Sequence, residues 1–169
     1  MRHLIIGNSA AGTAAAETIR ATDPQAEILL VSQDSAFYSR CQLHLVATGQ
    51  RSAEQANFLP GDWAKAHQVQ LLLGCAVTAV NPGERQATCA DGRTLTYDRL
   101  LLASGSRSVL PPVAGLAGPG TCSLRNIDDA LQIRTLYSTC KHVVIIGAGL
   151  VGCELAEALV EVGHPRSAW

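Results

Sequence analysis

The chain has 169 residues, a length that suits one domain, or one domain with part of another. Hydrophobic residues make up 47% of the chain and aromatic residues 4%, so Ala, Val, Leu and Gly must fill most of the core. The formal net charge is −1 with no block of like charges, which argues against nucleic acid and anionic membranes as partners.

The six cysteines are widely spaced and form neither a C-x-x-C pair nor a metal-type cluster. We therefore expect reduced thiols, a cytoplasmic protein and no bound metal. The N-terminus shows no secretory signal. The long apolar stretch 143–163 contains three glutamates, which argues against a membrane span.

The first 34 residues predict a βαβ unit. "HLIIG" is a short apolar strand, "AAGTAAAETIRAT" is an alanine-rich helix, and "AEILLVS" is a second buried strand with Asp34 just beyond it. This alternation favours an α/β fold with a parallel sheet.

The middle of the chain predicts more strands. "QVQLLLGCAVTAV" reads as one strand bent at Gly74, and Asp91-Gly92 between alternating residues predicts a hairpin. "RLLLASG" is a continuous apolar run, typical of a strand buried on both faces.

The last third begins with a linker and ends with a repeat of the opening pattern. "SVLPPVAGLAGPGTCS" is rich in Pro and Gly, and "NIDDALQIRTLY" predicts a helix capped by Asn126 with Asp128 and Asp129 in its first turn. "KHVVIIGAGLVGCELAEALVEVG" then repeats the order of strand, glycine turn and helix. The closing "PRSAW" does not match the strand that should come next.

The second glycine turn carries Gly147, Gly149 and Gly152, a full G-x-G-x-x-G. The first glycine permits the tight turn, the second lets a pyrophosphate approach the backbone, and the third allows the helix to lie on the sheet. The N–H groups and dipole at the helix start favour anionic phosphates. This context predicts a dinucleotide turn.

The first glycine turn, "GNSAAG", has Gly7 and Gly12 with Ser9 in the middle position. Serine is small enough for phosphate approach, and Asp34 at the end of the second strand can accept hydrogen bonds from ribose hydroxyls. The alternative interpretation is an ordinary tight turn with a solvated Asp behind it.

These two turns, with a hairpin and "LLLASGS" between them, resemble the pyridine nucleotide-disulfide oxidoreductase family of FAD/NAD(P) flavoproteins. The similarity is closest to the branch of rubredoxin reductases, ferredoxin reductases and the flavin part of NADH-dependent nitrite reductases. It rests also on "FYSRCQLHLVATG" and on "DGRTLTYDRLLLASGSRSVLPPVAG", in which Ser104 replaces the Thr of the family's A-T-G motif. Neither the C-x-x-x-x-C pair of glutathione reductases nor the C-x-x-C of thioredoxin reductases is present.

The resemblance implies a Rossmann-like FAD-binding domain whose parallel sheet carries a hairpin insertion, in residues 1–110. A linker and helix (111–140) and the first βα unit of a second, NAD(P)H-binding domain (141–169) follow. The implied FAD contacts are Gly7, Ser9, Ala10, Ala11, Gly12, Asp34, Arg40, Cys41, Ala103 and Gly105. The implied NAD(P)H contacts are Gly147, Gly149, Leu150, Val151 and Gly152.

The resemblance further implies that Glu154 lies near the contact between nicotinamide and flavin. Cys41 is either a small packing residue or, beside Arg40 and a flavin, a redox-active thiol. Arg40 is either a flavin or pyrophosphate partner or a surface cation. His44 and Trp63 are assigned no chemistry.

The resulting expectation is the N-terminal part of an FAD-dependent NAD(P)H oxidoreductase. It would pass a hydride from nicotinamide to flavin and electrons on to a protein or small-molecule acceptor. One alternative is a non-catalytic nucleotide- or flavin-binding fragment; another is a disulfide or peroxide reductase that uses Cys41. We expect the NAD(P)H site to be incomplete, and the unit from Val143 onward to pack on the FAD domain or to exchange with a second copy of the chain.

Overall fold

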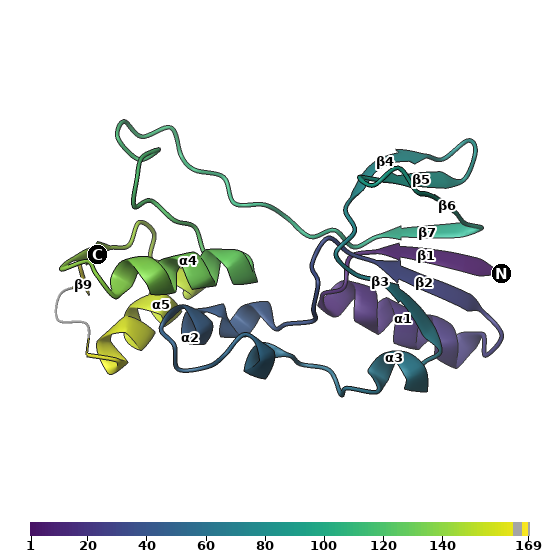
Figure 1. The fold of residues 1–169 in the computed structure, drawn as a ribbon, viewed down its shortest axis with the longest axis horizontal. Helices are drawn as coiled ribbons and strands as arrows, with labels where there is room; N and C mark the ends of the chain where they lie inside the picture. The colour runs from purple at the N-terminus through teal and green to yellow at the C-terminus, as the bar shows by residue number, and fades with distance from the viewer. Residues whose placement is uncertain (164–166, 169) are drawn as a thin grey trace. The chain divides into compact units, whose positions relative to one another are not determined.

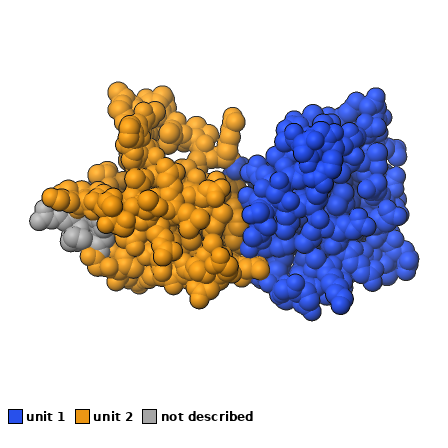
Figure 2. All heavy atoms as spheres, in the orientation of Figure 1, with its two compact units in different colours: residues 1–37, 58–106 blue, residues 38–57, 107–169 orange. Residues whose placement is uncertain are grey.

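The computed structural model describes residues 1–163 and the backbone of residues 167–168. The chain forms two compact units, Met1–Phe37 with Phe58–Ser106 and Tyr38–Asn57 with Arg107–Trp169 (Figure 2). The helices are α1 (Ala10–Thr22), α2 (Leu43–Ala47), α3 (Trp63–Ala66), α4 (Ile127–Tyr137) and α5 (Leu150–Glu161). The strands are β1 (Arg2–Ile6), β2 (Glu27–Val31), β3 (Val69–Leu72), β4 (Val77–Asn81), β5 (Gln86–Cys89), β6 (Thr94–Thr96), β7 (Arg99–Leu102), β8 (Val143–Val144) and β9 (Ser167–Ala168).

The first unit is built on a four-stranded parallel sheet with the order β3-β2-β1-β7 (Figure 1). Strands β1 and β2 and the helix α1 between them confirm the predicted βαβ unit, and α1 begins and ends at the predicted residues. The predicted α/β fold with a Rossmann-like parallel sheet is confirmed.

The two faces of this sheet are covered by different layers. On one face Ile5, Ile28 and Leu30 pack with Ala16 of α1 and Trp63 of α3. On the opposite face the alternate residues of the same strands pack with side chains of the β4–β6 region, forming a cluster of Leu4, Leu29, Val31, Cys75, Ala87, Cys89 and Tyr97. The alternation of side chains along each strand therefore sorts the core into two layers.

The segment predicted as one bent strand is two strands that belong to different sheets. At Gly74 the chain adopts a φ of +70°, which suits glycine, and it leaves the parallel sheet there. Strand β4 then starts the antiparallel sheet β4-β5-β6. The predicted hairpin at Asp91-Gly92 is confirmed, because it joins β5 to β6.

The expectation that "RLLLASG" is buried on both faces is wrong. Strand β7 lies at the edge of the sheet, with β1 as its neighbour among the described strands. Leu101 and Leu102 are 38% and 63% exposed. A continuous apolar run shows that a strand is hydrophobic, but it does not show where the strand lies in the sheet. At the edge, a strand has a neighbour on one side only, so its side chains are less covered.

Arg20 connects the end of α1 to the sheet. Its guanidinium donates to the carbonyl oxygens of Pro24 (2.6 Å), Ala26 (2.8 Å), His67 (2.9 Å) and Gln68 (3.1 Å). The planar five-donor group can serve several carbonyls at once, so this one side chain fixes the loops before β2 and β3.

The second unit is mainly helical. Helix α2 contacts both α4 and α5, around a core that includes Tyr38, Leu43, Val46 and Ala130. The predicted cap of α4 is confirmed: the Asn126 side chain accepts from the Asp129 N–H, and the Asp129 carboxylate accepts from the Asn126 N–H in a capping box.

The sequence predicts no further strand in the closing residues, and this prediction is wrong for two of them. Ser167 and Ala168 form β9, which pairs in parallel with β8. The ladder uses backbone groups and so does not require the apolar side chains that the sequence pattern lacks. Pro165, Arg166 and Trp169 of "PRSAW" lie outside the described residues.

Candidate functional site

The first glycine turn is fixed by two close backbone approaches. Gly7 has a φ of +117°, and a Cβ placed on it would overlap the carbonyl oxygen of Ala103. A Cβ on Gly12 would overlap the carbonyl oxygen of Gly7 and lie 3.3 Å from the Ile5 side chain. Both positions therefore require glycine, for the two reasons that the dinucleotide motif predicts.

Helix α1 begins directly above this turn. Ser9 is its N-cap residue, in an extended conformation, and its side chain makes no capping hydrogen bond. The backbone bond from the Thr13 N–H to the Ser9 carbonyl (3.1 Å) starts the helical pattern. The N–H groups of the first turn, which include those of Ala10 and Ala11, precede that pattern and point out of the helix start.

A buried polar link joins the turn to the loop that carries Asp34, and sequence reasoning missed it. Asn8, which is 4% exposed, donates to the Ala36 carbonyl (2.9 Å) and accepts from the Ser32 hydroxyl (3.0 Å). That hydroxyl also accepts from the Asp34 N–H (3.2 Å). Asn8 occupies a position of the motif at which any residue is allowed. The only indication of the link in the sequence was therefore a polar side chain next to Gly7.

The end of β7 completes the edge. The Ala103 N–H donates to the Ile6 carbonyl (2.8 Å), and Gly105 follows with a φ of +71°. The structure thus brings the first glycine turn, Asp34 and the Ala103–Gly105 segment to the carboxyl ends of β1, β2 and β7. In open α/β sheets this edge is where ligands bind.

The second turn repeats the backbone of the first, with Gly147 and Gly152 in the places of Gly7 and Gly12. Gly147 has a φ of +109°, and a Cβ on Gly152 would overlap the Gly147 carbonyl oxygen and lie 3.3 Å from the Ile145 side chain. Gly149 is the N-cap residue of α5 in the extended conformation that Ser9 adopts in α1. An ideal Cβ on Gly149 has no atom within 4 Å, so the space above it is open, and Leu150 and Val151 beside it are exposed.

Arg40 and Cys41 lie in the second compact unit. The Arg40 guanidinium donates to the Arg125 carbonyl (2.8 Å) and the Tyr38 hydroxyl (3.1 Å), and it lies 5.1 Å from the centre of the Tyr38 ring. Cys41 is a free, exposed cysteine. Arg40 is therefore a positioned cation rather than a loosely solvated one.

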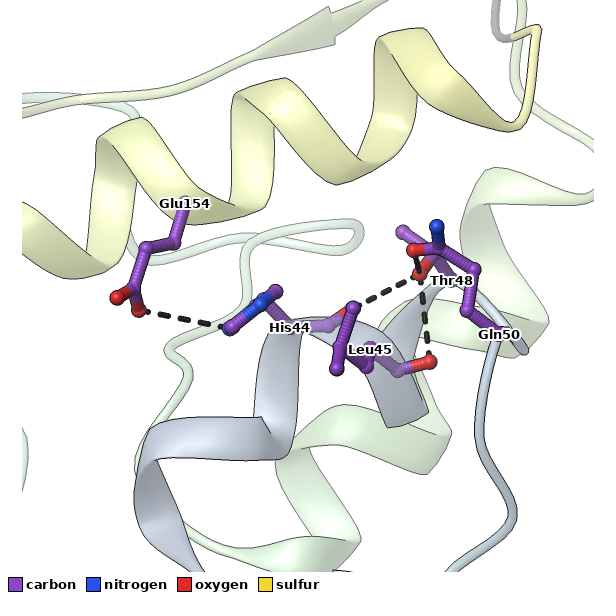
Figure 3. A network of polar contacts seen from close by, with 5 residues as sticks. All are labelled: His44, Leu45, Thr48, Gln50 and Glu154. Atoms are coloured by element: carbon purple, nitrogen blue, oxygen red, sulfur yellow. Dashed lines mark hydrogen bonds and ion pairs between the residues drawn. The ribbon is translucent and has the colours of Figure 1, made fainter.

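Glu154 meets a residue to which sequence reasoning assigned no chemistry. The His44 Nδ1 lies 3.4 Å from a Glu154 carboxylate oxygen, so α2 faces α5 through an ion pair whenever the histidine is protonated (Figure 3). At the C-cap of α2 the Thr48 hydroxyl lies 2.9 Å from the His44 carbonyl oxygen and 2.7 Å from the Gln50 side-chain oxygen, and its one proton can be donated to either acceptor. The Gln50 amide donates to Glu161 (2.9 Å), so side chains of residues 44–50 contact α5 one turn from its start and at its last residue.

The fold and its paired glycine turns define a Rossmann-like α/β protein with two turns of the dinucleotide type. The sequence profile of the pyridine nucleotide-disulphide oxidoreductases matches residues 1–166, and the chain belongs to this family. Among its described residues, no helix has the length and apolarity needed to cross a membrane.

Similar proteins cover nearly the whole chain. It is 34% identical, over 96% of its length, to the epsilon subunit of NADH-dependent phenylglyoxylate dehydrogenase from Aromatoleum evansii, and 33% identical, over 94%, to putidaredoxin reductase from Pseudomonas putida. It resembles the reductase in the covalent putidaredoxin reductase–putidaredoxin complex with a TM-score of 0.84 at 31% identity, covering 98% of this chain and 41% of that one. It also resembles NADH:rubredoxin oxidoreductase from Clostridium acetobutylicum, with a TM-score of 0.83 at 26% identity, covering 98% of this chain and 43% of that one. The chain spans 39% of the length of both curated relatives.

Replacing Gly12 with Ala should destabilise the first unit by about 2 kcal/mol, because the new methyl group must displace the backbone of Gly7. Urea denaturation followed by far-UV circular dichroism measures this change. Gly61→Ala is the matched control, since no atom lies within 4 Å of its ideal Cβ, and it should change stability by less than about 0.5 kcal/mol. Equal losses from both variants would contradict the steric account.

The His44–Glu154 pair should show a coupling energy of about 0.5 kcal/mol in a double-mutant cycle of His44→Ala and Glu154→Ala, measured near pH 6. Both side chains are partly exposed, which keeps the expected value small. The control cycle pairs His44→Ala with Glu157→Ala, because Glu157 is exposed on the same helix. A coupling to Glu157 as large as that to Glu154 would rule out a specific pair.

Proposed function

We propose that this chain carries the FAD site and the start of the NAD(P)H site of an FAD-dependent NAD(P)H oxidoreductase. The observation that carries the proposal is the pair of equivalent glycine turns, in which Gly12 and Gly152 let a helix begin against the carbonyl of the first glycine of the turn. The N–H groups at the start of each helix would then bind a pyrophosphate, and the space above Gly149 is open. The corresponding division is an FAD-binding domain over 1–110, a linker and helix over 111–140, and the start of the NAD(P)H-binding domain over 141–169.

On the FAD side, the turn from Gly7 to Gly12 would hold the pyrophosphate through the N–H groups at the start of α1. The Asp34 carboxylate would accept hydrogen bonds from the ribose hydroxyls, and the Asn8 link sets the position of the loop that carries it. Ala103 and Gly105 would border the same site. Arg40 and Cys41 are proposed as further FAD contacts.

On the NAD(P)H side, the turn from Gly147 to Gly152 would bind the second pyrophosphate, with Leu150 and Val151 in contact. Glu154 lies one turn into α5, and its contact with His44 would hold the carboxylate in one orientation. Bound FAD would accept the hydride that NAD(P)H donates and release electrons to an acceptor. The chain's own part is to bind, orient and shield these groups.

The names of the relatives support a protein or small-molecule acceptor. They include a reductase of putidaredoxin and an NADH oxidase from Methanocaldococcus jannaschii, which is 30% identical over 94% of this chain. Since this chain covers about two fifths of such proteins, the activity of the whole protein and its acceptor are proposals.

Two other functions remain in competition. A non-catalytic flavin- or nucleotide-binding fragment would use the same turns without turnover. A disulfide or peroxide reductase is favoured by one observation, that Cys41 is exposed and follows a positioned arginine.

The chain should bind added FAD, and Asp34→Ala should weaken that binding by roughly 10- to 100-fold, the value of one or two hydrogen bonds to a charged group. Fluorescence titration of FAD measures both affinities. Asp128→Ala is the control, because Asp128 is an exposed carboxylate in α4. This variant should bind FAD with the affinity of the unaltered chain. A chain that leaves FAD fluorescence unchanged would refute the proposed FAD site.

NADH should bleach the visible absorption of the bound FAD. FAD bound to the Cys41→Ser variant should be bleached at the same rate. If dithionite bleaches the flavin and NADH does not, the non-catalytic alternative gains support. If Cys41→Ser abolishes reduction of a disulfide or peroxide while NADH still bleaches the flavin, the thiol-dependent alternative replaces the leading one.

A further inference from the structure

Three potential metal ligands meet in the first unit, far from the glycine turns in sequence. They are Cys75, just after the turn at Gly74, Cys89 at the end of β5, and Asp91 in the hairpin turn. Their ligand atoms, two sulfurs and a carboxylate oxygen, all lie within 4.8 Å of one another. Sequence spacing does not reveal this group, because Cys75 and Cys89 are 14 residues apart and come together only when β4 pairs with β5.

The backbone at these positions is held by hydrogen bonds. The Cys75 N–H donates to the Ser32 carbonyl (2.8 Å), the Cys89 N–H to the Arg93 carbonyl (2.9 Å), and the Ala90 N–H to the Ala76 carbonyl (2.8 Å). The two thiols are 5% and 2% exposed as residues and pack in the core layer between the sheets. The ligand atoms are therefore presented by a fixed frame rather than by mobile loops.

The spacing suits a tetrahedral ion. Metal–sulfur bonds of about 2.3 Å and metal–oxygen bonds of about 2.1 Å place the ligand atoms of a tetrahedral zinc site roughly 3.6–3.8 Å apart. The Cys75 sulfur lies 3.9 Å from the Asp91 Oδ2, and all three ligand atoms lie within 4.8 Å of one another. Small rotations of the three side chains would close the site.

The charges also balance. Arg93 donates to the Asp91 carboxylate from its Nε (2.7 Å), so this ligand already has a fixed partner on the outer side of the group. A divalent ion that displaces the two thiol protons leaves the net charge of the group unchanged, and Arg93 would stay as an outer partner of the carboxylate.

We propose that Cys75, Cys89 and Asp91 form a binding site for a thiophilic divalent cation of the zinc class. Binding exchanges M²⁺ for the two thiol protons and forms two metal–thiolate bonds and one metal–carboxylate bond. The Asp91 side chain is 44% exposed, so water can reach the site from the side of the carboxylate. The site is independent of the proposed flavin chemistry and would tie the antiparallel sheet to its own hairpin turn.

Cobalt(II) is the probe, because tetrahedral cobalt–thiolate sites give intense near-ultraviolet and visible absorption. The titration uses the reduced full chain in which the other four cysteines, Cys41, Cys122, Cys140 and Cys153, are replaced by Ser. We expect one equivalent to bind with thiolate charge-transfer absorption, and zinc to displace it. Cys89→Ala should abolish the band, and Asp91→Asn should weaken binding by about tenfold or more. Glu84→Gln, an exposed carboxylate in the neighbouring turn, is the control and should bind cobalt unchanged.

A second measurement protects the test against misfolded variants. In the unaltered reduced chain, zinc should slow alkylation of Cys75 and Cys89, but not of the exposed Cys41, Cys140 and Cys153, as read by peptide mass spectrometry. Three results would overturn the proposal. They are no cobalt absorption band in excess metal, a band that persists in Cys89→Ala, or alkylation of Cys75 and Cys89 that zinc does not slow. Formation of a Cys75–Cys89 disulfide in air by a chain that binds no metal when reduced would likewise replace the metal site with a thiol pair.

Discussion

The close approach of α1 to the carbonyl of Gly7 is the constraint on which the first unit depends. Because Gly12 has no side chain, the helix can begin directly above the turn, and its axis then brings Ala16 against the sheet. The same turn leaves room at Gly7 for the carbonyl of Ala103, so β7 can pair with β1 up to its last residue. The absence of these two side chains thus permits both the close helix packing and the pairing of β7 with β1 at the candidate site.

The second turn shows that the same backbone geometry forms where the neighbouring elements are different. Gly147 and Gly152 reproduce the backbone of Gly7 and Gly12, including the contact with an isoleucine at the preceding strand, although the neighbouring elements differ. The middle position is the point of departure, with Ser9 in one turn and Gly149 in the other. Both adopt the same extended N-cap conformation, so the serine alters the space above the backbone and not the turn itself.

Local chemistry was predictable from sequence, and long-range pairing was not. The bounds of α1, the Asn126 cap and the Asp91-Gly92 hairpin follow from residues within a few positions of one another, and all three are confirmed. The split at Gly74 was missed because hydrophobicity does not reveal which sheet a strand joins. The Asn8 link, the His44–Glu154 contact and the cysteine pair each join residues that periodicity treats as unrelated.

The segment Tyr38–Asn57 lies between two parts of the first unit in the sequence but belongs to the second unit. Its helix α2 is anchored by the Tyr137 hydroxyl, which donates to the Thr48 carbonyl (2.8 Å), and by the shared core with Ala130 of α4. Arg40 is held by the Arg125 carbonyl just before α4 begins. The orientation of the arginine beside Cys41 therefore depends on the packing of α4, so substitutions at the start of that helix would reach the thiol's surroundings without touching the thiol.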